Sequence, residues 1–291
     1  GSMPPIVDMT QWNAGSHKAS GSSTCFDCHD NGHGSNKIKL MAPYDALSDG
    51  SPNDPLLQEE RFCYQCHDGS VAAANIQANF GQPSHHNISD TDQADGSKLE
   101  CANCHNPHYT SASTKLSNPD NGNSWSGTMS DFCLACHDGT PPDGVLFAGA
   151  GSGNPISTHS NQDATAVEAK FTSSCNQCHG PHGTNNGSLI KSDIQVTVGP
   201  TTLAGPVAFT ARTGIDSFDD GTNTGICVVC HLNTANTGFP MTNHAGGLGH
   251  SGGIDFSGYD CIQCHPHNVD VDSATLDGFM PDASCIGCHQ F

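Results

Sequence analysis

The cysteines of this chain all occur with one spacing. Each of the 16 cysteines lies in a Cys-x-x-Cys-His motif, and the motif occurs eight times. The cysteine pairs are Cys25 and Cys28, Cys63 and Cys66, Cys101 and Cys104, Cys133 and Cys136, Cys175 and Cys178, Cys227 and Cys230, Cys261 and Cys264, and Cys285 and Cys288. The histidines that follow them are His29, His67, His105, His137, His179, His231, His265 and His289.

Residues three and four positions apart share one face of a helical turn. Two thiols can therefore bond to the two vinyl groups of one haem, while the imidazole that follows binds the iron. This spacing is typical of c-type haem attachment. The sequence thus predicts eight covalently bound haems, each with a cysteine pair and a proximal histidine.

Three other uses of paired cysteines explain the motif less well. A zinc ribbon also uses Cys-x-x-Cys pairs but does not need a histidine after each one. A thioredoxin-like redox motif is expected once, in a βαβ unit, and not eight times. A disulfide framework gives no reason for the adjacent histidine.

Ten histidines remain after the proximal ones, and these are the candidates for the second, distal iron ligand. They are His17, His33, His85, His86, His108, His159, His182, His244, His250 and His267. In the first doublet we favour His86, and between His244 and His250 the sequence does not decide. A distal histidine can serve its own repeat, a neighbouring repeat or another subunit. His17 lies on a poorly anchored N-terminal arm that could reach across a subunit interface.

The distal candidates reveal an internal repeat. Four of them follow a motif within a few residues, and the other six precede the same four motifs. Each repeat therefore holds an upstream histidine, a motif, a downstream histidine and a second motif. The boundaries are about 17–80, 81–150, 151–240 and 241–291, within a single unit that spans residues 1–291.

The composition predicts a fold that is mostly irregular. Only 34% of the residues are hydrophobic, which is too few for an ordinary core in a chain of 291 residues. We expect short helices at the motifs, long polar loops and haems in place of a side-chain core. Within the insert 191–226, the segments IQVTV and PVAFTAR flank Gly-Pro and predict a short β-hairpin. This hairpin is expected to be a surface excursion or a subunit contact.

The charge and hydropathy of the chain limit its partners. A net charge of −20 argues against nucleic acid or anionic lipid as a partner. No stretch approaches the apolar length of a membrane span. Haem attachment of this type takes place outside the cytoplasm, so an export signal is expected to have been removed.

On these residues the chain resembles the multihaem c-type cytochromes that are built from doubled CXXCH motifs. The resemblance is carried by CHNPHY at 104–109, CHGPHG at 178–183, SLIK at 188–191, and FCxxCHDG at 62–69 and 132–139. The first and last repeats depart from this pattern, with CHDNGHG and CHPHN. Within the family, the chain is similar to periplasmic and outer-surface cytochromes of metal-reducing bacteria. Some of those proteins stack into filaments.

The resemblance implies an extracellular electron carrier, located outside the cell or at its surface. If every iron has two histidine ligands, no coordination position is open for a substrate, and the protein is not an enzyme. The expected partners are further copies of the chain in a filament, other redox proteins and a terminal acceptor such as a metal oxide or an electrode. The alternatives are a monomeric periplasmic shuttle and, less favoured, an octahaem reductase.

Overall fold

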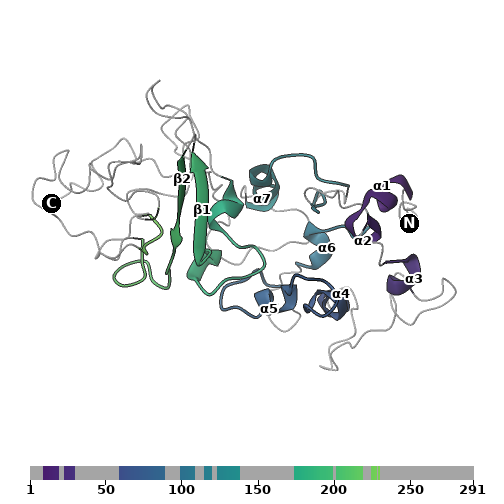
Figure 1. Cartoon of the computed structure of the whole chain (residues 1–291), viewed down its shortest axis with the longest axis horizontal. Coiled ribbons are helices and arrows are strands. Elements are labelled where there is room, and N and C mark those ends of the chain that lie inside the picture. Colours follow the sequence, from purple (N-terminus) through teal and green to yellow (C-terminus); the bar gives the residue numbers. More distant parts are fainter. Residues whose placement is uncertain are drawn as a thin grey trace, which may run out of the picture. The chain divides into compact units, whose positions relative to one another are not determined.

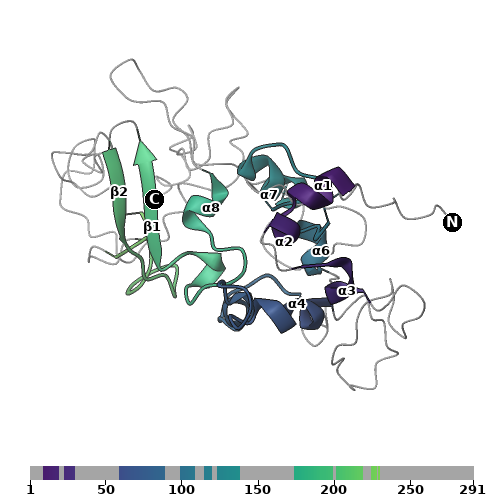
Figure 2. The same ribbon diagram turned by 45° about the vertical axis from the view of Figure 1, so that its right-hand side comes forward.

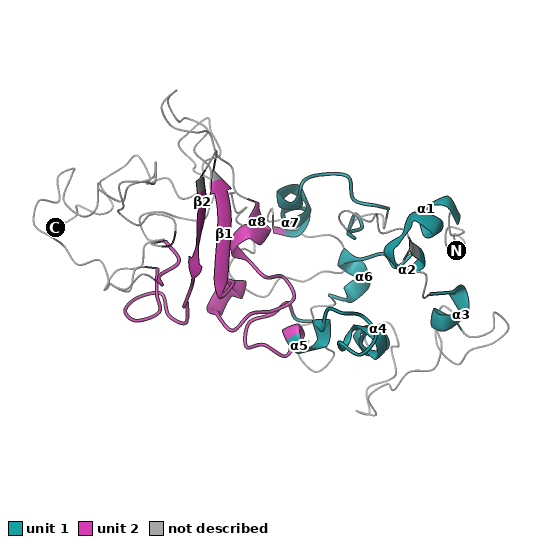
Figure 3. Cartoon of the chain, viewed as in Figure 1, with its two compact units in different colours: residues 1–78, 87–136, 140–152 teal, residues 79–86, 137–139, 153–291 magenta. Residues whose placement is uncertain are grey.

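The computed structural model describes residues 9–19, 23–29, 59–88, 99–108, 115–119, 123–137, 174–198, 201–218, 224–227 and 229. These residues form short helices and one pair of strands, joined by loops (Figure 1). The chain divides into two compact units (Figure 3). The first comprises residues 1–78, 87–136 and 140–152, and the second comprises residues 79–86, 137–139 and 153–291.

The fold class agrees with the expectation of many loops, short helices and little sheet. The helices are α1 (Met9–Ala14), α2 (Ser16–Ala19), α3 (Cys25–Cys28), α4 (Glu59–His67), α5 (Ile76–Phe80), α6 (Cys101–Cys104), α7 (Met129–His137) and α8 (Cys175–Cys178), with a 3-10 turn at Gly187–Leu189. Among the described residues, no helix is long and apolar enough to cross a membrane.

Three of the helices, α3, α6 and α8, are single turns that begin at the first cysteine of a motif. Each is fixed at its start by the side chain that precedes the second cysteine. Asp27, Asn103 and Gln177 accept hydrogen bonds from the backbone N–H of Thr24, Glu100 and Ser174 at 2.5, 2.6 and 2.7 Å. Such bonds satisfy N–H groups that a helix start leaves without an intrahelical acceptor. The histidine that follows is extended and ends the turn.

The other two motif helices, α4 and α7, are nine residues long and carry the motif at their C-terminal ends. In α7 the start is fixed by a reciprocal pair of hydrogen bonds. The Thr128 N–H donates to Asp131 Oδ2 at 3.1 Å, and the Asp131 N–H donates to Thr128 Oγ1 at 3.1 Å. In the first two predicted repeats, the first motif therefore lies in a single helical turn and the second in a longer helix, although their cysteine spacing is the same.

The described strands, β1 (Asp193–Val198) and β2 (Thr201–Pro206), form an antiparallel hairpin with Val198 opposite Thr201. The first strand matches the alternating IQVTV segment. The returning strand is TTLAGP, which precedes most of the PVAFTAR segment that we expected to pair. Pro206 is the last residue of β2, and the pairing extends by one more bond, from the Val207 N–H to the Ser192 carbonyl at 2.9 Å.

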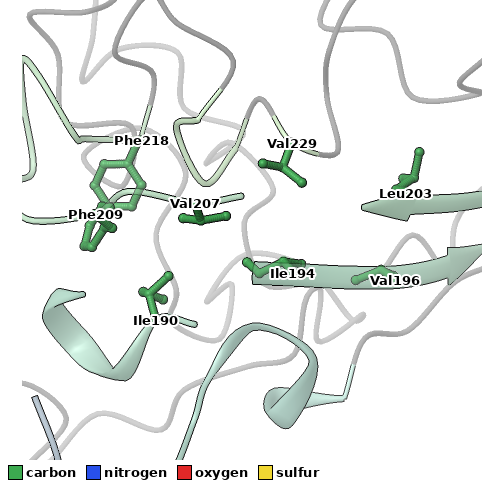
Figure 4. Packing of buried hydrophobic residues seen from close by; sticks show 8 residues of the cluster. All are labelled: Ile190, Ile194, Val196, Leu203, Val207, Phe209, Phe218 and Val229. Atoms are coloured by element: carbon green, nitrogen blue, oxygen red, sulfur yellow. The ribbon is translucent and has the colours of Figure 1, made fainter. Parts of the chain in front are cut away.

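One face of the hairpin is buried in a small hydrophobic core (Figure 4). Because side chains alternate across a strand, Ile194 and Val196 point to the same side of β1. They pack with Ile190, Leu203, Val207, Phe209, Phe218 and Val229. Ile194 retains only 1% of its exposure, and the Phe209 and Phe218 rings meet edge to face at 4.8 Å.

The loops around this core are joined by one buried amide side chain. Asn186 Nδ2 donates to the carbonyls of Lys191 and Val207 at 3.1 and 2.9 Å. Asn186 Oδ1 accepts from the Phe209 N–H at 3.0 Å. A single side chain thus holds the segments before and after the hairpin together.

The hairpin is more than a surface excursion, because its core also contacts haem-attachment residues. Cys178 and Cys227, from two different motifs, pack against the hydrophobic cluster. Helix α8, which carries Cys178, lies beside β1 (Figure 2). The core that buries the hairpin therefore packs against two of the predicted haem-attachment motifs.

We predict that Ile194→Ala weakens this core locally. Removing a fully buried isoleucine side chain of this kind costs about 2–5 kcal/mol. Hydrogen exchange measured by mass spectrometry should show a corresponding loss of protection across residues 190–218 in the haem-loaded protein.

The matched control is Ile215→Ala, because Ile215 lies in the same region but is 82% exposed. Its protection pattern should stay close to that of the parent protein. Equal losses for the two variants would contradict the packing described for β1.

Candidate haem-ligand sites

The described cysteines of the predicted haem-attachment set form no disulfide. They are Cys25, Cys28, Cys63, Cys66, Cys101, Cys104, Cys133, Cys136, Cys175, Cys178 and Cys227. The other members, Cys230, Cys261, Cys264, Cys285 and Cys288, lie outside the described residues. Each described pair from the first five motifs lies within one helix, with both thiols on the side expected for attachment to a single haem.

Thiols of different motifs lie close together in the first unit. Burial raises the pKa of Cys28, and the neighbouring Cys66 and Cys63 thiols raise it further. Burial likewise raises the pKa of Cys104 to about 12, with a contribution from Cys136. The first and second motifs are therefore neighbours, and so are the third and fourth.

Two proximal histidines are oriented by backbone carbonyls. His105 Nδ1 donates to the Lys115 carbonyl at 2.5 Å, and His179 Nδ1 donates to the Ser188 carbonyl at 3.0 Å. A hydrogen bond at Nδ1 leaves Nε2 as the nitrogen that binds iron, and it fixes the plane of the ring. His231, His265 and His289 lie outside the described residues.

The segments that supply these carbonyls have the same local structure in the second and third repeats. Lys115 and Leu189 both have a positive φ, of 55° and 58°. The residue after each is a buried aliphatic side chain, Leu116 or Ile190. The N–H of the following residue then donates to the backbone carbonyl of the motif's second cysteine. The Ser117 N–H donates to the Cys104 carbonyl and the Lys191 N–H to the Cys178 carbonyl, both at 2.9 Å. In both repeats, the segment after the motif is therefore hydrogen-bonded back to the motif and orients its histidine.

The structure brings three proximal histidines opposite three distal candidates. The ring centroids of His29 and His108 are 5.9 Å apart. Those of His67 and His17 are 6.1 Å apart, and those of His137 and His86 are 6.3 Å apart. Each pair joins one histidine of a motif to one outside the motifs.

These separations fit two imidazoles that bind a single iron. A coordinating nitrogen lies about 2 Å from the metal and roughly 1 Å from its ring centre, so opposed rings are centred about 6 Å apart. Aromatic rings in ordinary contact span a similar range. An ordinary contact, however, gives no reason for each pair to combine a motif histidine with a spare one. The residues therefore fit bis-histidine ligation.

Two of the distal candidates that lie opposite a motif histidine are oriented by the carbonyl of a proline. His17 Nδ1 donates to the Pro107 carbonyl at 3.2 Å, and His86 Nδ1 donates to the Pro181 carbonyl at 2.7 Å. As with the proximal histidines, this leaves Nε2 as the nitrogen suited to bind iron. His17 is thus placed opposite His67 of its own chain.

Burial favours the neutral imidazole at one of these sites. It is the largest cause that holds the pKa of His67 below its ordinary value, and the charges of His17 and His105 add to it. Neutral imidazole is the form that binds a metal. The local environment therefore keeps His67 in its ligating form.

Two further distal candidates lie beside Phe80. His85 Nδ1 donates to the Gln82 carbonyl at 2.7 Å, and its ring lies 6.3 Å from that of Phe80. His182 lies 5.6 Å from Phe80. His33, His159, His244, His250 and His267 lie outside the described residues.

Sequence reasoning missed the residues that position the distal histidines. Trp12 is buried, and its ring lies 6.2 Å from that of His108. The carbonyls of Pro107 and Pro181 are backbone groups, which leave no signature of their own in a side-chain pattern. The available signal was the shared Pro-His step in CHNPHY and CHGPHG.

One comparison with known proteins finds a family for part of the chain. Residues 94–141 match the family model described as the doubled CXXCH motif. Searches of curated proteins and of solved structures found no match. The family match supports a multihaem c-type cytochrome with covalently bound haem.

The histidine doublet gives a direct test of the ligand geometry. We predict that His86→Ala converts one haem per chain from low spin to high spin, because His86 is the residue opposite His137. The change is measured by magnetic circular dichroism or electron paramagnetic resonance of the oxidised protein.

The neighbouring substitution His85→Ala is the control, since the His85 ring lies against Phe80. It should leave all haems low spin. A high-spin haem in His85→Ala together with an unchanged spectrum in His86→Ala would reverse the assignment.

Proposed function

We propose that this chain carries eight c-type haems, each held between two histidines, and that it transfers electrons without catalysing a bond-making reaction. The observation that carries the proposal is the set of three imidazole pairs, which match the spacing of two ligands on one iron. The eight motifs and the match to the doubled CXXCH family support the same function.

When bound, the haems supply a one-electron iron couple, and closely spaced haems exchange electrons. The chain's own residues attach, orient and space them. The proximity of Cys28 to Cys66, and of Cys104 to Cys136, supports close spacing within the first and second repeats. Two imidazole ligands per iron also leave no open position for a substrate, so a reductase is disfavoured.

The proposed setting is outside the cytoplasm, with the cell exterior or cell surface favoured over the periplasm. The net charge of −20 keeps copies of the protein apart unless specific contacts join them. We propose that such contacts form a cytochrome filament, with other redox proteins as donors and a metal oxide or electrode as acceptor. The alternative is a monomeric periplasmic shuttle.

The electron-carrier proposal predicts a specific spectrum for the purified, oxidised protein. Mass spectrometry should find eight haems bound per chain, and magnetic circular dichroism should find every one of them low spin. A high-spin haem that binds small nitrogen or sulfur substrates would favour the reductase instead.

The filament proposal is tested separately, by light scattering combined with negative-stain imaging of the haem-loaded protein. Long fibres are expected, and they should persist on dilution if the subunit contacts are specific. Discrete particles of single-chain size would favour the shuttle and would leave the electron-carrier proposal intact.

A further inference from the structure

The N-terminal helices lie against a dipeptide of the second repeat, Pro107–His108. Helices α1 and α2 pack together, and both reach this dipeptide. Trp12 of α1 is 7% exposed and lies 6.2 Å from the His108 ring. His17 of α2 donates from Nδ1 to the Pro107 carbonyl at 3.2 Å. Trp12 and His17 therefore both contact residues that are distant in the sequence.

The same dipeptide faces both haem sites of the first repeat. His108 is centred 5.9 Å from His29, and the two ring planes are inclined by only 15°. His17, which the Pro107 carbonyl orients, is centred 6.1 Å from His67, with its ring plane inclined by 67°. Adjacent residues of one repeat thus meet two different motifs of another.

From this arrangement we infer that Pro107–His108 completes both haem sites of the preceding repeat. His108 is the distal ligand of the haem attached to Cys25 and Cys28. Pro107 acts as a positioning residue, because its carbonyl orients His17, which is the distal ligand of the haem attached to Cys63 and Cys66. The inference rests on the proposed bis-histidine function and adds which repeat supplies each ligand.

A second Pro-His step supports the positioning role independently. The Pro181 carbonyl of the third repeat accepts a hydrogen bond from His86 Nδ1 at 2.7 Å. His86 belongs to the second repeat, and its ring is centred 6.3 Å from that of His137. In both cases the proline of one repeat orients the upstream histidine of the repeat before it. A chance contact of the N-terminal arm would not produce the same arrangement twice.

The arrangement has a consequence for how the repeats depend on each other. The first repeat contains both of its cysteine pairs and both proximal histidines, but His108 and the Pro107 carbonyl come from outside it. Loss of His108 should therefore appear at the first haem and not at the haem of its own motif, which is attached to Cys101 and Cys104. A change at the first haem, and not at the haem attached to Cys101 and Cys104, distinguishes the inference from ligation within a repeat.

The test combines His108→Gly with removal of the first haem. In the full chain, His108→Gly should produce one high-spin haem, which added imidazole should return to low spin. In a chain that also carries Cys25→Ala and Cys28→Ala, the same substitution should add no high-spin haem. A high-spin haem that appears in that second background would overturn the inference, as would an unchanged spectrum in the first.

The matched control is His86→Gly, which should produce one high-spin haem in both backgrounds because it faces His137. The unsubstituted chain separates the two levels of the proposal. If it already contains high-spin haems, the bis-histidine function fails. If it is wholly low spin and only the His108 results disagree, the function stands and the repeat assignment fails.

A second measurement does not depend on a chain that lacks the first haem. Nearly parallel imidazole planes give a rhombic low-spin resonance, whereas strongly inclined planes give a more anisotropic one. The resonance lost in His108→Gly should therefore be rhombic, and the one lost in His86→Gly should be anisotropic, since its planes are inclined by 52°. The opposite assignment would overturn the inference.

Discussion

Under the proposed function, the separation of two imidazoles on one iron is the constraint on which the rest of this structure depends. It requires that two rings, often distant in the sequence, be centred about 6 Å apart with their Nε2 atoms facing each other. Backbone carbonyls that accept from Nδ1 orient four of the candidate ligands, His17, His86, His105 and His179. The irregular segments that supply these carbonyls therefore orient the candidate ligands, because loops can place carbonyls where regular helices and strands cannot.

The predictable part of the fold was local. The first five motifs begin or end short helices, and β1 matches the IQVTV segment. The repeat of histidines around the motifs picked out His17, His86 and His108 as candidates for distal ligands, and the structure places each of them opposite a motif histidine. These features follow from spacing over a few residues, which a single sequence shows directly.

The unpredictable part was the pairing across long distances. Nothing in the neighbourhood of His29 indicates that His108 faces it, because the approach depends on loops and on the packing of Trp12. The hairpin was predicted, but its burial was not, for a related reason. Its alternating residues indicated a strand, but the cluster that buries Ile194 also includes Phe218 and Val229, which come from later segments of the chain. A pattern shows which side chains need burial, and only the tertiary structure shows what covers them.

The hydrogen bonds between histidine and proline carbonyl also bear on how the protein is made. They join residues that are 90 positions apart for His17 and Pro107, and 95 apart for His86 and Pro181. Contacts of such long range form late, after the intervening chain has been ordered. In a chain that folds from its N-terminus first, each early histidine therefore lacks its proline partner until the next repeat has folded. Completion of these hydrogen bonds then runs one repeat behind the folding of the chain, and a truncated chain leaves its last complete repeat without its proline partner.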